Sequence, residues 1–253
     1  MSTPVTGSSA YDEFYYRHCV GGDAYKRDRS WLEFNARIAD RIVQDIRPAA
    51  SLDAGCGFGF LVEALHDRGV DAAGMDVSEY AIQHVHESVR AKCWAGSLVV
   101  DLPRRYDLVT TVEVLEHLPA ADAERAIANI CAHTDDVLFS STPFDRKELT
   151  HVNVQPPEHW AEQFARHGFF RDVDFDASFI TPWAVRFRRR LDPIHRIVRD
   201  YERRFAPMEY ERNEIRQKAF ELQRTLAEAR APLPRWAWRL VRRIGGRLLR
   251  PFR

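Results

Sequence analysis

The sequence lacks the features that would place a protein in a membrane or in an oxidising compartment. No run approaches the roughly 20 consecutive apolar residues of a transmembrane helix. The first nine residues, Met-Ser-Thr-Pro-Val-Thr-Gly-Ser-Ser, do not have the regions of a signal peptide. Only 4 cysteines occur in 253 residues, and none stands in C-x-x-C spacing. These absences predict a cytoplasmic protein with reduced, unpaired cysteines.

The chain also lacks a net charge, because 37 Lys and Arg balance 37 Asp and Glu. The charges are nevertheless segregated along the chain. Residues 183–253 hold 20 basic and 8 acidic residues, which leaves 37−20 = 17 basic and 37−8 = 29 acidic residues in the body. A basic end predicts an interaction surface there, whereas an acidic body argues against a nucleic-acid partner.

A third absence concerns a glycine motif. Asp53-Ala-Gly55-Cys-Gly57-Phe-Gly59 stands between an apolar run and a helical pattern, but the third glycine of G-x-G-x-x-G is replaced by Phe60. Alternate glycines let the backbone press against a ligand, and the helix that follows directs free N–H groups at it. The loop therefore argues against a pyrophosphate cofactor and for a smaller ligand.

Two carboxylates flank this loop. Asp76 ends a short apolar strand about 20 residues beyond the glycines, the usual distance for an acid that binds ribose hydroxyls. Asp53 ends the preceding strand and is well placed for an ammonium group. A ligand with a ribose and an amino acid but no phosphate has the shape of S-adenosylmethionine.

Hydrophobic patterns of period 2 and period 3.6 alternate through the body of the chain, which predicts an α/β fold with a mostly parallel sheet and helices on both faces. The expected helices are Trp31–Ile46, Phe60–Arg68, Ser78–Val89, Ala121–Ala132 and Glu158–His167. The expected parallel strands are Ala50–Asp53, Ala72–Met75, Lys92–Ala95, Tyr106–Thr111 and Asp136–Ser140. Ala184–Arg188 alternates apolar and charged residues, as an antiparallel outer strand would.

The pattern divides the chain into three parts: a flexible leader and lid at 1–30, the α/β domain at 31–190, and a helical basic extension at 191–253. In the extension, Ile215, Ala219, Leu222 and Leu226 follow the 4,3,4 spacing of a short coiled-coil seam, which predicts a homodimer. A helix packed on its own domain is the alternative. Residues 235–253 contain seven arginines and no acid, which is typical of a helix lying on an anionic membrane at the inner face, or of a solvated helix end or dimer contact.

Three segments, Leu52–Gly59, Gly74–Ser78 and Tyr106–Leu118, resemble the class I S-adenosylmethionine-dependent methyltransferases, and the resemblance extends over residues 10–190. It implies a Rossmann-like, seven-stranded fold with a lid over the cofactor near residues 11–29. It also implies that three glycines approach the methionine part, that Asp76 holds the ribose and that the end of the third strand borders adenine. The cofactor site implied comprises Asp53, Gly55, Cys56, Gly57, Gly59, Asp76, Val77, Ser97, Leu98 and Val112.

The segment Glu113-Val-Leu-Glu116-His117 follows the strand at 106–111 and should lie beside the transferred methyl group. His117 is the candidate general base for methyl transfer to oxygen, with His151 and Glu113 as further catalytic candidates. The alternative is a structural role, in which the histidine only caps the next helix.

The same residues offer a second interpretation as metal ligands. E-x-x-E-H is similar to the arrangement in ubiquinone-pathway O-methyltransferases and in small-RNA 2′-O-methyltransferases, where it binds a divalent cation. The resemblance implies a site for a divalent ion, with Mg²⁺ expected, formed by Glu113, Glu116, His117 and His151. Glutamates that cap a helix are the alternative.

The acceptor should meet residues that follow the strand at 136–140, namely Phe144, Asn153, Gln155 and Trp160. Amides and aromatic rings suit a sugar, and the whole pattern resembles bacterial methyltransferases of polysaccharides or glycolipids, including mannoside O-methyltransferases. We therefore expect a small saccharide acceptor. A quinone-type phenol, an RNA ribose and a non-catalytic scaffold are the alternatives.

Overall fold

The computed structural model describes residues 10–20 and 25–230, with side chains up to residue 227. The chain divides into two units, Met1–Ile197 and Val198–Arg253. The first nine residues of the expected leader, Gly21-Gly22 of the expected lid and the basic segment 235–253 lie outside the described residues. No helix within the described ranges is long and apolar enough to cross a membrane.

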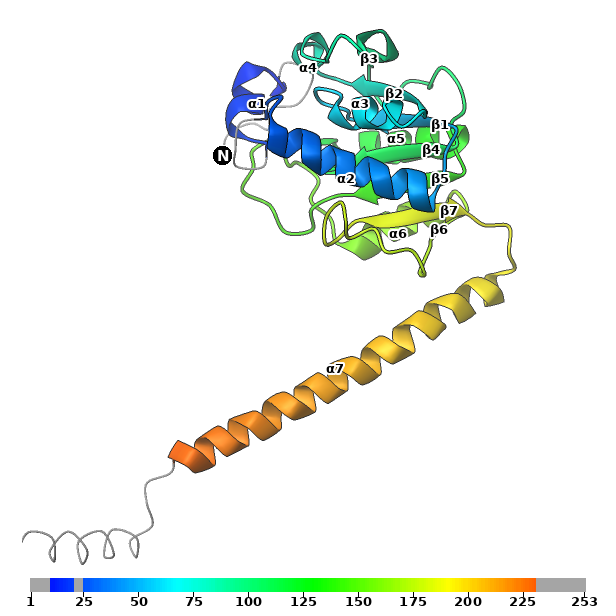
Figure 1. Cartoon of the computed structure of the whole chain (residues 1–253). Coiled ribbons are helices and arrows are strands. Elements are labelled where there is room, and N and C mark those ends of the chain that lie inside the picture. The colour runs from blue at the N-terminus through cyan, green and yellow to red at the C-terminus, as the bar shows by residue number, and fades with distance from the viewer. Residues whose placement is uncertain (1–9, 21–24, 231–253) are drawn as a thin grey trace, which may run out of the picture. The chain divides into compact units, whose positions relative to one another are not determined.

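The first unit is built on a seven-stranded sheet of order β3-β2-β1-β4-β5-β7-β6 (Figure 1). Strands β1 to β5 pair in parallel, and β7 is antiparallel to both β5 and β6. This confirms the expected mostly parallel sheet. The strands are β1 Ala50–Ala54, β2 Asp71–Asp76, β3 Cys93–Ala95, β4 Leu108–Val112, β5 Asp136–Ser140, β6 Phe169–Arg171 and β7 Val185–Arg189.

One strand was missing from the sequence analysis. We expected the segment Ala184–Arg188 to be the outer strand, but β7 lies inside β6, which forms the edge. The three residues of β6 are too few to show an alternating pattern, and Arg171 follows two phenylalanines directly.

Helices cover both faces of the sheet. Ile38 and Ile42 of α2 pack in one core with Leu61 and Val62 of α3, and residues of α5 and α6 pack in the other, on the opposite face (Figure 1). The helices are α1 Glu13–His18, α2 Arg29–Asp45, α3 Phe60–His66, α4 Glu79–Gln83, α5 Ala120–His133, α6 Pro157–Ala165 and α7 Ile194–Arg230, with 3₁₀ turns at Arg90–Lys92 and Leu115–His117.

Helix α4 is much shorter than the expected Ser78–Val89. Ser78 caps it, accepting a hydrogen bond from the Ala81 N–H at 3.0 Å. Beyond Gln83, the Ser88 hydroxyl and the His86 ring bond each other at 2.8 Å. Such local side-chain bonds offer the chain an alternative to the helix.

The order of the strands indicates where a ligand binds. After β1 the chain adds β2 and β3 on one side, and then crosses to build β4 and β5 on the other. The crevice at the carboxyl ends of β1 and β4 is therefore the topological switch point where such sheets bind ligands.

The glycine loop follows β1 at this point. Gly55 has a φ of +88°, and a Cβ there would lie 2.3 Å from a methyl carbon of Val114. Its N–H donates to the Met75 carbonyl at 2.7 Å. Glycine is required because the loop, β2 and the segment after β4 meet with no room for a side chain.

A buried ion pair secures the antiparallel strand. Arg186 of β7 and Asp136 of β5 form a bidentate ion pair. Nε of Arg186 donates to Oδ1 of Asp136 at 2.8 Å, and Nη2 donates to Oδ2. Their side chains are 10% and 13% exposed. Arg188, two residues on, approaches the same carboxylate at 3.8 Å but is 54% exposed.

We expect Arg186→Ala to lower the free energy of unfolding by about 3 kcal/mol or more, because it leaves the Asp136 charge buried without its partner. Arg188→Ala is the matched control and should cost less than about 1 kcal/mol, since its pair is solvent-screened. Urea denaturation of both variants measures the difference. Equal losses would show that the buried pair does not hold β7 in place.

Candidate active site

Two cavities open at the carboxyl ends of β1, β2 and β4, with volumes of about 450 and 950 Å³. Tyr15, Val20, Tyr25 and Gly55 line both, so the cavities adjoin. Their sizes fall in the range of small-molecule sites. The pair can hold two ligands that meet near Gly55.

Asp76 is the polar anchor of the first cavity. Its two carboxylate oxygens accept backbone N–H bonds from Gly57 and Ser78, each at 2.8 Å. Burial raises the pKa of the Asp76 carboxyl, and these backbone bonds oppose the rise. The carboxylate therefore ties the glycine loop to β2, and its remaining lone pairs line the cavity for hydroxyl groups.

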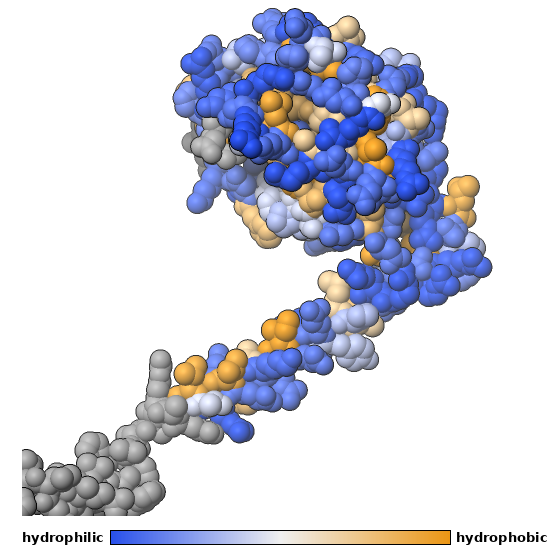
Figure 2. All heavy atoms as spheres, in the orientation of Figure 1, coloured by the Kyte–Doolittle hydropathy of each residue, from blue (hydrophilic) through white to orange (hydrophobic). Residues whose placement is uncertain are grey.

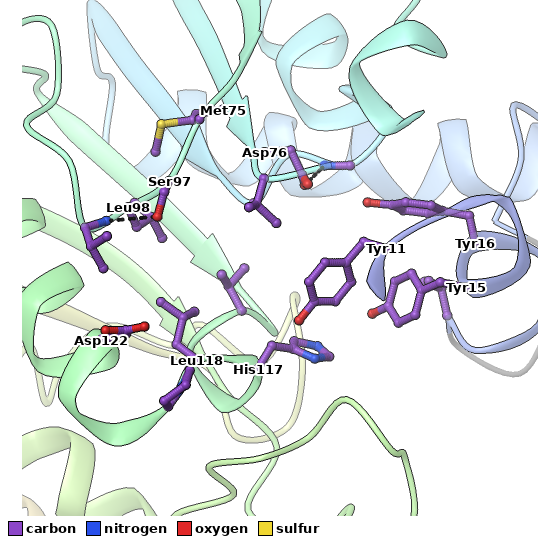
Figure 3. A pocket seen from close by; sticks show the side chains of 18 of the residues that line it. Tyr11, Tyr15, Tyr16, Met75, Asp76, Ser97, Leu98, His117, Leu118 and Asp122 are labelled. Atoms are coloured by element: carbon purple, nitrogen blue, oxygen red, sulfur yellow. Dashed lines mark hydrogen bonds between the residues drawn. The ribbon is translucent and has the colours of Figure 1, made fainter. Parts of the chain in front are cut away.

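The far wall of the first cavity suits a flat ring. Met75, Leu98 and Leu118 supply apolar surface, and Ser97 and Asp122 supply polar atoms at the edge (Figure 3). Val77 also lines this cavity. The structure thus brings together Asp76, Val77, Ser97 and Leu98, which the resemblance assigned to the ribose and adenine.

Tyrosines from the N-terminal segment complete this cavity, and none of them was a predicted site residue. Tyr11, Tyr15, Tyr16 and Tyr25 all line it. Burial raises the pKa of Tyr11 to about 12, so its hydroxyl remains a neutral donor. The signal was the clustering of four of the chain's 8 tyrosines within fifteen residues.

Asp53 lies in the second cavity at the end of β1. Its carboxylate accepts a bond from the Thr110 hydroxyl at 2.6 Å. Burial raises the pKa of Asp53 to about 6, the Thr110 bond acts against this shift, and the nearby Asp76 adds to it. Cys56 and Val112 line the same cavity, whereas Gly59 lines neither and instead begins α3.

Glu113 and Glu116 form a separate carboxyl pair. Glu113 adopts a left-handed φ of +55° and accepts bonds from the Ser140 hydroxyl at 2.6 Å and the Trp183 indole at 2.8 Å. Glu116 is fully buried and accepts the Thr142 N–H at 3.2 Å. Burial and the adjacent Glu113 both raise the pKa of Glu116, which favours its protonated form. Its role in this geometry is to join β4 to β5.

A different set of residues offers metal ligands. One ligand atom from each of His117, Glu148 and His151 lies within 4.8 Å of the other two. Of the expected set, this group contains His117 and His151 but neither glutamate: Glu113 lines the second cavity while bonded to Ser140 and Trp183, and Glu116 is bonded to Thr142. Glu148 was missed, although its position three residues before His151 was a readable signal.

The protons in this cluster can be assigned from its partners. A carbonyl only accepts, so Nδ1–H of His117 donates to Thr150 at 3.3 Å and Nδ1–H of His151 donates to Asp145 at 2.8 Å. Nε2 of His151 then faces a Glu148 oxygen at 3.2 Å. Two lone pairs repel, so a proton or a metal ion must lie between them.

His117 carries the free nitrogen. Burial and, to a lesser extent, His151, whose ring centroid is 4.6 Å away, lower the pKa of His117 to about 4. The imidazole is neutral near pH 7, and its Nε2 is a proton acceptor. His117 lines the first cavity beside Tyr11, while His151 lines the second (Figure 3).

The expected acceptor residues are not at the cavities. Trp160 is 1% exposed and packs in the core against Phe139, so it cannot stack on a substrate. Asn153 is buried and accepts a bond from Gln155 at 2.9 Å. Phe144 is 78% exposed. None of these four residues lines either cavity; the aromatic side chains of the second cavity are Tyr15, Tyr25, Trp31, Phe34 and Trp183.

Known proteins are similar in sequence to parts of this chain. It is 35% identical over 111 residues to a ubiquinone biosynthesis O-methyltransferase of Nitrosomonas europaea, which covers 40% of this chain and 47% of the relative. It is 36% identical over 100 residues to the same enzyme of Methylococcus capsulatus, covering 36% and 42%. The chain spans less than half the length of these curated relatives.

Solved structures share the fold. A magnesium protoporphyrin IX methyltransferase of Synechocystis with bound S-adenosylhomocysteine superposes with a TM-score of 0.52 at 19% identity, covering 63% of this chain and 83% of that one. An amino pentose methyltransferase of Micromonospora echinaspora gives 0.50 at 18% identity, covering 65% and 93%.

The match to a family profile extends further along the chain. Residues 24–170 match the profile of a family described as a methyltransferase domain. This range is more than half of the 253 residues and contains the glycine loop, Asp76 and the segment from Glu113 to His151. The chain therefore belongs to this family of methyltransferase domains.

Proposed function

We propose that the protein transfers the methyl group of S-adenosylmethionine to a hydroxyl oxygen. The observation that carries this proposal is the pair of adjoining cavities with the neutral His117 beside their junction. The first cavity takes the nucleoside, with its ribose at Asp76. The methionine part extends past Gly55 to Asp53 in the second cavity, and the rest of the second cavity takes the acceptor. Gly55 lets the two ligands approach because it has no side chain.

The transfer is an in-line displacement. The acceptor oxygen forms a bond to the methyl carbon, the carbon–sulfur bond breaks, and its electron pair stays on sulfur. Nε2 of His117 takes the hydroxyl proton as the bond forms, which makes the oxygen a better nucleophile. Burial is the main reason that His117 is neutral and can accept this proton.

A divalent cation bound by His117, Glu148 and His151 is the second candidate, favoured by the facing lone pairs at 3.2 Å. When bound, such an ion would lower the pKa of the acceptor hydroxyl. Two imidazoles and one carboxylate suit Zn²⁺ or Mn²⁺ better than the expected Mg²⁺, which takes mainly oxygen ligands. A metal on Nε2 of His117 excludes that atom as the base, so the two candidates are distinguishable.

We propose a phenolic acceptor of the quinone-precursor type. The second cavity is bordered by Trp31, Phe34 and Trp183, whose rings suit an aromatic ligand. The amides of Asn153 and Gln155, on which the expectation of a sugar rested, bond each other instead. The names of the curated relatives support the same acceptor class.

A saccharide is the second candidate acceptor. Asp28, Asp145 and Glu148 also line the second cavity, and carboxylates are good acceptors for several sugar hydroxyls. The same acids disfavour an RNA ribose, because its phosphates need lysine and arginine contacts.

Cofactor affinity should depend on pH through Asp53. Its carboxylate must be ionised to bind the ammonium group, and with a pKa of about 6 it protonates as the pH falls. We expect S-adenosylhomocysteine to bind about tenfold more weakly at pH 5 than at pH 7, measured by calorimetry. The charged or titratable groups facing Asp53 are Asp76, Cys56 and Tyr25.

Asp53→Asn should bind weakly at both pH values, and its affinity should not change with pH. Thr110→Val removes the donor that stabilises the ionised form, so the midpoint should move to higher pH. Undiminished affinity of the Asp53→Asn variant would place the ammonium elsewhere, and no binding by the wild-type protein would favour a scaffold.

His117→Ala should slow methyl transfer by about 10²- to 10⁴-fold, because the base is lost. Affinity for S-adenosylhomocysteine should stay within a few-fold. The exposed His167, which lies outside both cavities, provides the control variant His167→Ala. Chelation followed by Zn²⁺, Mn²⁺ or Mg²⁺ separates the two mechanisms. Loss and recovery of turnover would replace the base by a metal, whereas a fully active His117→Ala would remove both.

The acceptor class can be tested with a methyl-transfer screen of catechols, other phenols and short mannosides. We expect product with a catechol, and we expect Trp183→Ala to raise the KM for it more than it lowers kcat, because the ring contributes binding surface. Methylation of mannosides but not of phenols would restore the saccharide assignment.

A further inference from the structure

Helix α7 carries a long apolar seam in the second unit. Only its last four members were predicted from the sequence, but the 3,4 spacing runs through the unit from its first residue. Apart from Arg212, every seam position is apolar or aromatic. The seam consists of Val198, Tyr201, Phe205, Met208, Arg212, Ile215, Ala219, Leu222 and Leu226. Four successive heptads with apolar residues at positions a and d are the pattern of a coiled coil.

The apolar side chains of this seam are exposed. The exposed fractions of Phe205, Ile215 and Leu222 are 56%, 59% and 66%. Apolar patches are visible along α7 in Figure 2. A single helix buries nothing against itself, and α7 also contains Pro207, which removes one helical hydrogen bond. Long isolated helices depend on packing of an apolar face, so the seam requires a partner helix.

We propose that α7 pairs with α7 of a second copy of this chain as an antiparallel coiled coil. The pairing is centred between Asn213 and Glu214, so that residue 212 of one helix faces residue 215 of the other. Position a then packs against position d of the partner from Tyr201 to Leu226. Pro207 lies at position c, which faces away from the seam.

Side-chain size favours this orientation. In the antiparallel pairing the Met208 layer meets Ala219, and the Phe205 layer meets Leu222, so larger side chains face smaller ones. A parallel pairing would instead place Phe205 against Phe205 and Ala219 against Ala219, which alternates crowded layers with gaps.

Charge favours the same orientation. In a parallel pair Arg212 would meet Arg212 inside the seam, whereas in the antiparallel pair it lies opposite Ile215. Arg212 already contacts Glu209 of its own helix at 2.5 Å. At the flanks, Glu211 lies beside Lys218 of the partner subunit, and Glu209 lies beside Arg216 of the partner subunit. Each opposite-charge contact occurs twice by symmetry.

The charged residues on the polar side of α7 also indicate which kind of partner the helix has. Glu202, Glu214 and Glu221 are interspersed with arginines, and all three are exposed. An anionic membrane would repel these acids. A second helix with both signs of charge satisfies them, and α7 itself is such a helix.

Sedimentation of the full chain tests the pairing. We expect a dimer that Leu222→Asp weakens by about a hundredfold or more, because the carboxylate would be buried in the seam. Phe220→Asp is the matched control, since both side chains are 66% exposed but Phe220 lies off the seam at position b. It should change the dissociation constant less than about threefold. Binding of S-adenosylhomocysteine should be unchanged in both, which shows that the first unit stays folded.

Orientation is tested by exchange of charges and by cross-linking. Glu211→Lys should weaken the dimer about threefold or more, and Glu211→Lys with Lys218→Glu should restore it, since these positions are seven residues apart in one helix and meet only across an antiparallel pair. Under oxidation, a mixture of Met208→Cys and Ala219→Cys chains should cross-link with each other, and neither should cross-link alone beyond the wild-type level.

Three results would overturn the proposal. The first is a monomer at concentrations of tens of micromolar. The second is a dimer that Leu222→Asp and Phe220→Asp weaken equally, which would place the contact elsewhere. The third is self-cross-linking of Met208→Cys, which would make the pairing parallel.

Discussion

The hydrogen bonds between the Asp76 carboxylate and the backbone of Gly57 and Ser78 are the constraint on which the site depends. They join the glycine loop after β1 to the end of β2, and thereby fix where α3 and α4 begin. Gly55 is held between the cavities by the same arrangement, because its N–H bonds Met75 on the adjacent strand. A loop free to move would leave the donor and acceptor cavities without a common wall. The geometry of transfer therefore begins with a buried acid whose lone pairs serve the protein and the ligand together.

The parts of this site that the sequence predicted are those in which local sequence dictates geometry. The glycine spacing, the acid at the end of β2 and the alternation of strands and helices each constrain the backbone directly. Glu113 and Glu116 share one sequence motif with His117, but they do not lie in the group that it forms with Glu148 and His151. The left-handed φ of Glu113 turns the chain after β4, so the two carboxylates point at β5. Sequence spacing carries no record of such a turn at a non-glycine residue.

The acceptor site is still harder to predict from the sequence. Asn153 and Gln155 have the chemistry of a sugar site, yet Gln155 donates a hydrogen bond to Asn153 and neither lines a cavity, and Trp160 is a core residue of α6. The cavity takes its aromatic wall from the first turns of α2 and from Trp183, which are separated by about 150 residues of sequence. Only the folded sheet brings them together. Substrate class is therefore decided by tertiary contacts, whereas cofactor class follows from one loop and one strand.

The two histidines, His117 and His151, differ in their surroundings. Two imidazoles with ring centroids 4.6 Å apart cannot both carry a charge at low cost. Glu148 lies against His151, whereas burial beside the Tyr11 and Tyr15 rings favours the neutral form of His117. A neutral imidazole keeps one nitrogen as a proton acceptor, which is the form that a general base needs. In the proposed reaction, a hydroxyl in the second cavity gives its proton to His117, and His151 lines that cavity with its ring against that of His117.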